Sequence, residues 1–177
     1  MSLIIRNSIR VLLINEKKEI LLLLADDPKT TSIDGKERGR FWFVIGGEIN
    51  YDESTEEAAI REIYEETGLK EDEVKLGPIV WFGEYDLILD GKLTHLKQRF
   101  MVAKTKIKEV SLTKLDGWEK KVIQKLAWFS IDDIKNSEDI IYPVGIDEYL
   151  VDILAEKYPT DPIEIDLDRK PKQQNQR

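Results

Sequence analysis

Acidic residues gather in the segment Gly46–Leu69 at a spacing that brings carboxylates together. Glu62 is followed by Glu65 and Glu66 three and four positions later, shortly before a glycine of the kind that ends helices. Residues at this spacing are neighbours on a helix surface, where like charges repel one another. They also fall in the last turn, where the helix dipole favours cations. Because the pattern costs helix stability, it indicates a cation site, with a solvated acidic face as the alternative.

The available ligands restrict which cation such a site would take. The sequence contains no cysteine and a single histidine, His95. A thiolate site is therefore excluded, and any metal would be held by oxygen atoms or by this one imidazole. Oxygen ligands suit hard cations, so Mg²⁺ is the predicted metal, with Mn²⁺ as an alternative.

One short strand and one helix are expected to position these carboxylates. Phe41–Ile45 has strand-like composition and leads into two glycines, which permit positive φ angles and the close approach of another group. Ser54 is a good N-cap residue, and Glu57 completes a capping-box pattern. This pattern predicts a helix over Thr55–Thr67.

Apolar runs on both sides of this helix predict a sheet. They indicate one hairpin before the helix and a second one after it, with a turn at Asp90–Gly91. A capping box at Ser130 starts a short helix, and the apolar spacing predicts a last helix over Ile146–Tyr158. The predicted strands besides Phe41–Ile45 are Ile4–Ile14, Ile20–Ala25, Ile79–Leu89, Leu93–Lys104 and Val122–Phe129.

Length and composition are typical of a single globular domain. A chain of 177 residues is long enough to bury a substantial core. We assign residues 1–159 to this domain. Residues 160–177 are predicted to form a flexible tail, because this segment offers little apolar surface. Polar loops are predicted over Asp26–Arg40 and Lys106–Lys121.

Charge and hydropathy argue against membrane and nucleic-acid partners. The formal net charge is -8 at pH 7, which disfavours binding to nucleic acid or to anionic lipid. No apolar run approaches the roughly 20 residues that span a bilayer, and the N-terminal stretch lacks a signal-peptide cleavage site. We therefore expect a cytoplasmic protein. The oligomeric state stays open, and a homodimer is one alternative.

The spacing across the acidic segment resembles the signature of the Nudix hydrolase family. Five residues separate Gly47 from Glu53, and seven more precede the run Arg61–Leu69, which reads REIYEETGL. Trp128–Asp133 also resembles the family's common last strand and following helix. The resemblance implies an α/β/α sandwich around a mixed β-sheet. It further implies metal-dependent hydrolysis of a nucleoside diphosphate linked to another group.

By this resemblance, the metal ligands are side chains of the predicted helix and one carbonyl group. Glu62 and Glu66 are the principal ligands, and Glu65 is a third ligand or a bridge between metals. The backbone carbonyl near Gly46 is a further ligand, which the paired glycines would allow. Mg²⁺ suits the implied reaction, because it neutralises charge on phosphoryl oxygens and activates water.

The resemblance assigns supporting roles to three more residues. Arg61 is expected to orient a glutamate through an ion pair, and Glu53 to position the helix or to bind a further ion. Family members often use an acid from a later loop as an additional ligand or general base, and Glu119 is the candidate here. An ordinary loop acid is the alternative interpretation of Glu119. The predicted catalytic residues are Arg61, Glu62, Glu65 and Glu119.

Several other residues have two interpretations. Trp42, Trp81 and Phe82 could stack on a base or sugar, although aromatic residues in strands more often belong to the core. His95 has no partner histidine, so we interpret it as structural or as part of the surface. Basic residues could contact phosphate, and a solvated surface is the simpler account. They are Lys36, Arg38, Arg40, Lys97 and Arg99.

The substrate is the least constrained part of the hypothesis. Ile45, Asn50 and Asp52 depart from the commonest family pattern, at positions outside the signature. Nucleoside triphosphates, nucleotide sugars such as ADP-ribose, and dinucleoside polyphosphates all fit the chemistry. A non-catalytic nucleotide sensor is the alternative function, and the complete acidic set argues against it. A decapping enzyme is disfavoured by the acidic charge.

Overall fold

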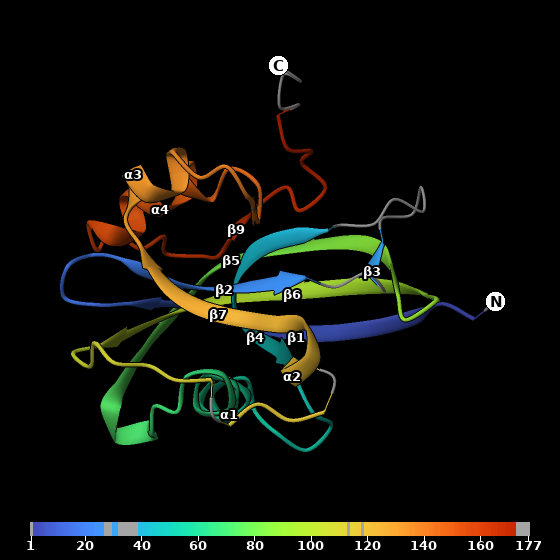
Figure 1. Ribbon diagram of the computed structural model, residues 1–177, viewed down its shortest axis with the longest axis horizontal. Coiled ribbons are helices and arrows are strands. Elements are labelled where there is room, and N and C mark those ends of the chain that lie inside the picture. The colour runs from blue at the N-terminus through green and yellow to red at the C-terminus, as the bar shows by residue number, and fades with distance from the viewer. Residues whose placement is uncertain (1, 27–29, 32–38, 113, 118, 173–177) are drawn as a thin grey trace.

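The apolar runs of the sequence form one mixed β-sheet, which helices cover on both faces (Figure 1). A computed structural model describes residues 2–26, 30–31, 39–112, 114–117 and 119–172. Within these residues the sheet has nine strands, and the arrangement confirms the predicted α/β/α sandwich. The strands are β1 (Ile4–Ile14), β2 (Ile20–Asp26), β3 (Thr30–Thr31), β4 (Arg40–Glu48), β5 (Val74–Leu89), β6 (Lys92–Thr105), β7 (Ile123–Phe129), β8 (Ile140–Tyr142) and β9 (Ile163–Glu164). The helices are α1 (Thr55–Thr67), η1 (Glu71–Glu73), α2 (Glu119–Val122), α3 (Ile131–Lys135) and α4 (Ile146–Leu154).

Strand β1 pairs with β6, β4 and β2 and so joins the two halves of the sheet. It runs parallel to β6, beginning with Ile4 opposite Thr94. It runs antiparallel to the end of β4, where Arg10 lies opposite Gly46. The strand order is β3-β5-β6-β1-β2-β4-β8, with β7 paired to β2 and β9 paired to β5.

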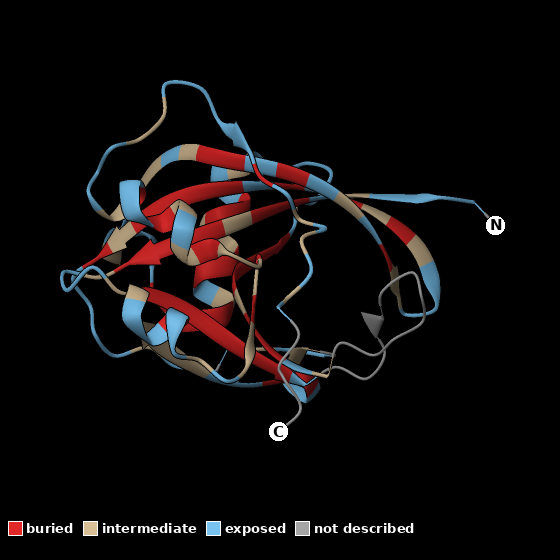
Figure 2. Cartoon of the chain, turned by 90° about the horizontal axis from the view of Figure 1, so that it is seen from above, coloured by how far each residue is buried: buried red, intermediate tan, exposed pale blue. Residues whose placement is uncertain are grey.

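Each face of the sheet has its own hydrophobic core, and buried strands run between the helices (Figure 2). Ile9, Val11 and Leu13 of β1 pack in the core beneath α1. Leu12 and Ile14 pack in the opposite core with α3 and α4. This alternation follows from the two-residue period of a strand. Among the helices that the structure describes, none has the length and apolar character that a membrane span requires.

Helix α1 begins and ends where the sequence predicts. The Ser54 hydroxyl accepts a hydrogen bond from the Glu57 amide at 3.1 Å, and the Glu57 carboxylate accepts one from the Ser54 amide at 2.7 Å. Gly68 follows the helix with φ of 76°, and its amide donates to the Tyr64 carbonyl. This left-handed conformation favours glycine. The capping box and the glycine thus set both ends of the helix that carries the acidic residues.

The second predicted hairpin is confirmed as β5 and β6. Asp90 and Gly91 connect the strands with φ angles of 49° and 74°, and tight hairpin turns favour such positive values. Strand β5 is longer than predicted and begins at Val74. The predicted capping box at Ser130 is also confirmed, and it starts α3.

Three further boundaries differ from the predictions. Strand β4 continues through both glycines to Glu48, because these glycines pair with β1 and do not form a turn. Helix α4 ends at Leu154 and not at Tyr158, since Glu156 adopts a positive φ of 59°. The predicted loop over residues 106–121 contains the start of α2, so Glu119 lies in a short helical turn.

The chain after Pro159 forms more structure than its composition predicts. Strand β9 adds to β5 in parallel orientation. Ile165 is buried, and its amide donates a hydrogen bond to the Phe82 carbonyl at 2.9 Å. Leu167 packs against the same core. A few well-placed apolar residues are therefore enough to attach this segment, in contrast to the flexible tail predicted there; residues 173–177 lie outside the described part of the chain.

Candidate active site

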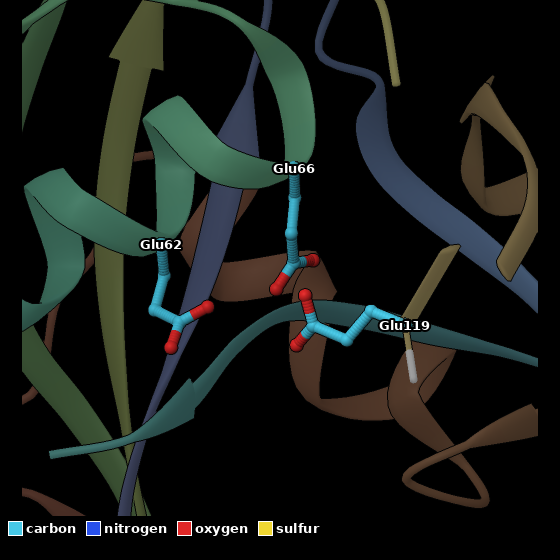
Figure 3. Close-up of side chains that lie close together, drawn as sticks. All are labelled: Glu62, Glu66 and Glu119. Carbon is cyan, nitrogen blue, oxygen red and sulfur yellow. The ribbon is translucent and has the colours of Figure 1, made fainter. Parts of the chain in front are cut away.

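Two carboxylates of α1 meet a third one from a distant part of the sequence (Figure 3). Glu62 and Glu66 project from successive turns of α1, and Glu119 reaches toward them from α2. Ligand oxygens of the three residues lie within 4.8 Å of one another. The four-residue spacing places Glu62 and Glu66 on one helix face. The fold alone brings Glu119 to them.

Two of the three carboxylates are buried and incompletely hydrogen-bonded, and Glu119 is half-buried. Glu62 is 4% exposed and Glu66 is 1% exposed. The Oε2 atom of each has no hydrogen-bond partner among the residues that the structure describes. Burial, with Glu62 alongside, raises the pKa of Glu66 well above its ordinary value, and burial also raises the pKa of Glu119. Because a hard cation would supply the missing partner of each oxygen, these residues fit a divalent-metal site.

The two glycines of β4 make room for the acidic side chains. A Cβ atom on Gly47 would lie 2.8 Å from Cδ of Glu62. A Cβ atom on Gly46 would lie 2.8 Å from Cα of Arg10 in β1. The Gly46 amide donates a hydrogen bond to Oε1 of Glu66 at 3.2 Å. A side chain at either position would displace a carboxylate or separate the strands.

Arg61 ties the acidic helix to the loop that precedes it. Its guanidinium donates hydrogen bonds to both carboxylate oxygens of Glu53, at 3.0 and 2.6 Å, and to the Glu48 carbonyl at 2.9 Å. It also donates to Oε1 of Glu62 at 2.9 Å. The ion pair lowers the pKa of Glu53 and raises that of Arg61. Such charge-assisted bonds hold Glu62 in one orientation.

Three of the predicted metal ligands have partners within the protein. The Glu65 side chain is 38% exposed and accepts a hydrogen bond from Arg61 at 3.3 Å. It lies outside the cluster, because Glu65 and Glu66 stand on opposite sides of Glu62 around the helix. The Gly46 carbonyl accepts a hydrogen bond from Arg10 at 3.0 Å. Glu53, a predicted ligand of a further ion, is occupied by Arg61.

A cavity of about 420 Å³ adjoins the carboxylate cluster, and Glu66 and Glu119 form part of its wall. This volume falls within the range of small-molecule sites, roughly 300 to 1,000 Å³. Arg6 and Arg10 line it and share one face of β1. These cations would attract an anionic ligand in spite of the negative net charge. The aromatic lining residues are Phe41, Phe43, Tyr85, Phe100 and Tyr142.

Arg10 is the cationic group most firmly held in this wall. Its guanidinium donates to the Val44 carbonyl at 3.5 Å as well as to Gly46, and it lies 5.8 Å from the centroid of the Phe43 ring. Burial lowers the pKa of Arg10, and the carboxylate of Glu66 opposes this effect. Neither Arg6 nor Arg10 is among the site residues predicted from the sequence. A cation inside the apolar run Ile9–Ile14 is the signal that could have found Arg10.

The remaining aromatic candidates divide between core and surface. Trp42 and Trp81 are buried and belong to the core on the α4 side of the sheet, which confirms that interpretation. The Trp42 indole donates a hydrogen bond to Asp139 at 3.2 Å. Phe82 is exposed on β5 and is not among the residues that line the cavity.

His95 and the basic candidates lie at the molecular surface or outside the described residues. His95 contacts Asp86 at 2.6 Å and Glu84 at 3.1 Å, and these carboxylates raise its pKa. The surface interpretation of His95 agrees with these contacts. The other basic residues have protein partners: Lys97 pairs with Glu84, Arg99 donates to Thr55, and Arg40 pairs with Asp139. Lys36 and Arg38 lie outside the described part of the chain.

The fold is a mixed sheet between helices, and the site combines buried carboxylates with a cavity that arginines line. These features are those of an enzyme that hydrolyses phosphate compounds. Residues 5–145 match the NUDIX domain, and the chain belongs to this family. The predictions of a Nudix hydrolase and of an enzyme acting on phosphorus-containing anhydrides are thereby confirmed.

Solved structures with the same fold agree with the family assignment. A MutT protein from Methanosarcina mazei is 22% identical with a TM-score of 0.57, over 89% of this chain and 97% of that chain. A MutT NUDIX hydrolase from Burkholderia pseudomallei is 21% identical with a TM-score of 0.55, over 83% and 98%. An ADP-ribose pyrophosphatase from Streptococcus suis is 17% identical with a TM-score of 0.54, over 91% and 98%. At these identities the likeness extends to the fold alone.

Proposed function

We propose that this Nudix hydrolase is a divalent-metal-dependent pyrophosphohydrolase whose substrate is a nucleoside diphosphate linked to another group. The observation that carries the proposal concerns two buried carboxylate oxygens, from Glu62 and Glu66, that have no hydrogen-bond partner among the described residues. They lie beside a cavity that Arg10 lines. Groups of opposite charge in one cavity suit a substrate that is an anion and binds a cation.

Glu62, Glu66 and Glu119 would hold the metal, with Mg²⁺ as the expected ion. When bound, Mg²⁺ offsets the charge of the phosphoryl oxygens and acidifies a coordinated water. Glu119 is also the candidate general base, because its carboxyl faces the cluster from a separate element.

Arg61 would act as a positioning residue in this site. Its bonds to Glu53 and to the Glu48 carbonyl attach α1 to the end of β4, so that Glu62 and the paired glycines keep a constant separation. Glu65 contributes through the same guanidinium. Preorganised charge of this kind lowers the cost of reaching the transition state.

The cavity has a cationic part, which the arginines line, and an apolar part. Arg10, next to Gly46, and Arg6, farther along the same face of β1, would bind phosphate oxygens. Apolar and aromatic side chains farther along β5 and β6 would receive the nucleoside. This division supports a nucleotide over inorganic pyrophosphate as the substrate.

A substrate panel tests the proposal. The protein is incubated with ATP, ADP-ribose, UDP-glucose and diadenosine tetraphosphate, each with Mg²⁺, with Mn²⁺ or with a chelator. Products are identified by chromatography. We expect cleavage between two phosphorus atoms of at least one compound, with no turnover in the chelator. Nucleotide binding without cleavage of any compound would favour the sensor hypothesis and refute the enzyme proposal.

A further inference from the structure

The C-terminal segment Ile163–Arg169 lies outside the residues that match the family, yet it borders the cavity. We call residues 163–169 the C-terminal strap. Leu167 of the strap lines the cavity together with Tyr85, Leu87 and Leu96 of the β5–β6 hairpin. Since the NUDIX match ends at residue 145, this part of the wall lies outside the matched residues.

Several contacts hold the strap against the rest of the protein. Strand β9 extends the sheet at β5. The Ile165 amide donates to the Phe82 carbonyl at 2.9 Å, and the Ile165 side chain is buried. At the far end, Arg169 donates hydrogen bonds of 2.7 and 3.0 Å to the two carboxylate oxygens of Glu148 on α4. The strap is therefore attached on both sides of Leu167.

Two glycines allow the strap to pack closely. A Cβ atom on Gly83 would lie 2.6 Å from Cγ of Leu167 and 2.9 Å from the Ile165 carbonyl oxygen. A Cβ atom on Gly145 would lie 2.7 Å from the guanidinium carbon of Arg169. A larger residue at Gly83 would push the strap outward, whereas one at Gly145 would displace the guanidinium of Arg169. The position of Leu167 over β5 thus depends on Gly83.

The sheet register relates the position of Gly83, which contacts Leu167, to the acidic end of the site. Gly83 on β5 lies opposite Gln98 on β6. Ser8 on β1 lies between Gln98 and Glu48, the residue on β4 that follows the paired glycines. Three strand spacings, or about 14 Å across the sheet, therefore separate Gly83 on β5 from Glu48 on β4. A phosphoanhydride held at the acidic end would leave its nucleoside over β1 and β6, facing Leu167.

From this placement we infer that the C-terminal strap forms the nucleoside end of the substrate site, with Leu167 packing against the base or sugar. The inference rests on the proposed function, since that function places the phosphates at the carboxylates. Leu87, Leu96 and the ring of Tyr85 complete an apolar surface that suits a nucleoside. Arg169 is a positioning residue, which holds the strap in place through Glu148.

Two ligands that differ only by the nucleoside test the inference. They are α,β-methylene-ADP and methylenediphosphonate, measured by calorimetry with Mg²⁺ present. Leu167→Ala should weaken binding of the nucleotide by about 5- to 10-fold, because apolar contact is lost. Its affinity for methylenediphosphonate should stay within about twofold. Ile163→Ala, on the same strap but 50% exposed and outside the cavity lining, is the control and should change neither affinity.

Unchanged nucleotide affinity in Leu167→Ala overturns the inference. An equal loss for both ligands also overturns it, because the strap would then act on the phosphate end or on folding. A wild-type protein that binds the nucleotide no more tightly than methylenediphosphonate refutes the inference as well. These titrations do not depend on hydrolysis, so a negative substrate panel refutes the proposed function without deciding the role of the strap.

Hydrogen exchange on the unaltered protein supplies a second measurement that no folding defect can affect. We expect α,β-methylene-ADP to slow amide exchange in residues 163–169, while methylenediphosphonate leaves this segment unchanged and slows exchange near α1. Equal effects of the two ligands on the strap would contradict the inference. Kinetics provide a further check: Leu167→Ala should raise KM for a cleaved nucleotide while kcat stays within about twofold.

Discussion

The two carboxylate oxygens of Glu66 have different surroundings. Its Oε1 atom accepts a hydrogen bond from the Gly46 amide, which fixes the carboxylate next to the glycine pair. Its Oε2 atom is buried without a partner among the described residues, and Glu62 lies beside it. A residue selected for stability alone would avoid this position, because buried unpaired charge is costly. The cost is removed if a cation occupies the cluster.

Glu66→Gln should separate catalysis from folding. We expect turnover to fall by about 100-fold or more, since even the outer contacts of metal ligands commonly contribute 10- to 100-fold. The measurement is kcat on whichever nucleotide the wild-type protein cleaves best. Glu56→Gln is the control, because Glu56 is an exposed acid on the same helix. Near wild-type turnover in Glu66→Gln would remove this residue from the reacting centre.

The same substitution should raise stability when metal is absent. With a chelator present, Glu66→Gln is expected to increase the free energy of unfolding, because one of two adjacent buried carboxylates loses its charge. Added Mg²⁺ should raise the melting temperature of the wild-type protein by binding only the folded state. That shift should disappear in the variant. A variant that is less stable than wild type in chelator would show that Glu66 has a structural role instead.

At the scale of single elements, α1 is held at both ends by local contacts and in the middle by its core face. The Ser54–Glu57 capping box and the left-handed Gly68 define its limits. Ala58, Ala59 and Ile63 pack on the sheet, so that Glu62 and Glu66 face the space beneath β4. The local caps and the packing against the sheet both favour the same helix. This combined stabilisation offsets the repulsion between the acidic side chains of its last turn.

Ser54→Ala tests how much the cap contributes. Loss of one N-cap hydrogen bond should lower the free energy of unfolding by about 1 kcal/mol, measured by urea denaturation. Ser130→Ala removes the equivalent bond from α3 on the other face of the sheet and serves as the comparison. Amide exchange should increase in α1 for the first variant and in α3 for the second. Faster exchange in both helices for either variant would mean that the effect is not local.

At the scale of the whole molecule, the C-terminal strap completes the core on the α4 side. Ile165 joins Trp81, Val80 and residues of α4 in one buried cluster. The family match ends before this segment, so part of the core is closed by residues beyond the matched domain. Stability and the shape of the cavity wall therefore depend on the same short segment.

Ile165→Ala should reveal this contribution to stability. Ile165 is 3% exposed, and truncation of a buried isoleucine typically costs about 2 to 5 kcal/mol. Ile163→Ala, two residues earlier on the exposed side of β9, should cost less than about 0.5 kcal/mol. Both values come from urea denaturation. Equal values for the two variants would show that the strap contributes little to the core.

Much of the fold could be predicted because its signals are local. The period of the apolar residues places β1, β2, β5 and β6, and side-chain caps place α1 and α3. The boundaries that differ depend on distant partners. β4 continues through Gly46 and Gly47 because β1 lies beside them, and the segment with Ile165 packs because β5 offers an edge.

The sequence by itself determined the acidic motif of α1, the preference for a hard cation and, through the spacing from Gly47 to Leu69, the family. These features depend on residue type and on short-range helical geometry, both of which are readable along the chain. Only the tertiary structure decided which acids meet. It brought Glu119 to Glu62 and Glu66, directed Glu65 to Arg61, and placed Arg10 and Leu167 in the wall of one cavity. Contacts across strands and between distant segments are set by packing and register, which no local pattern encodes.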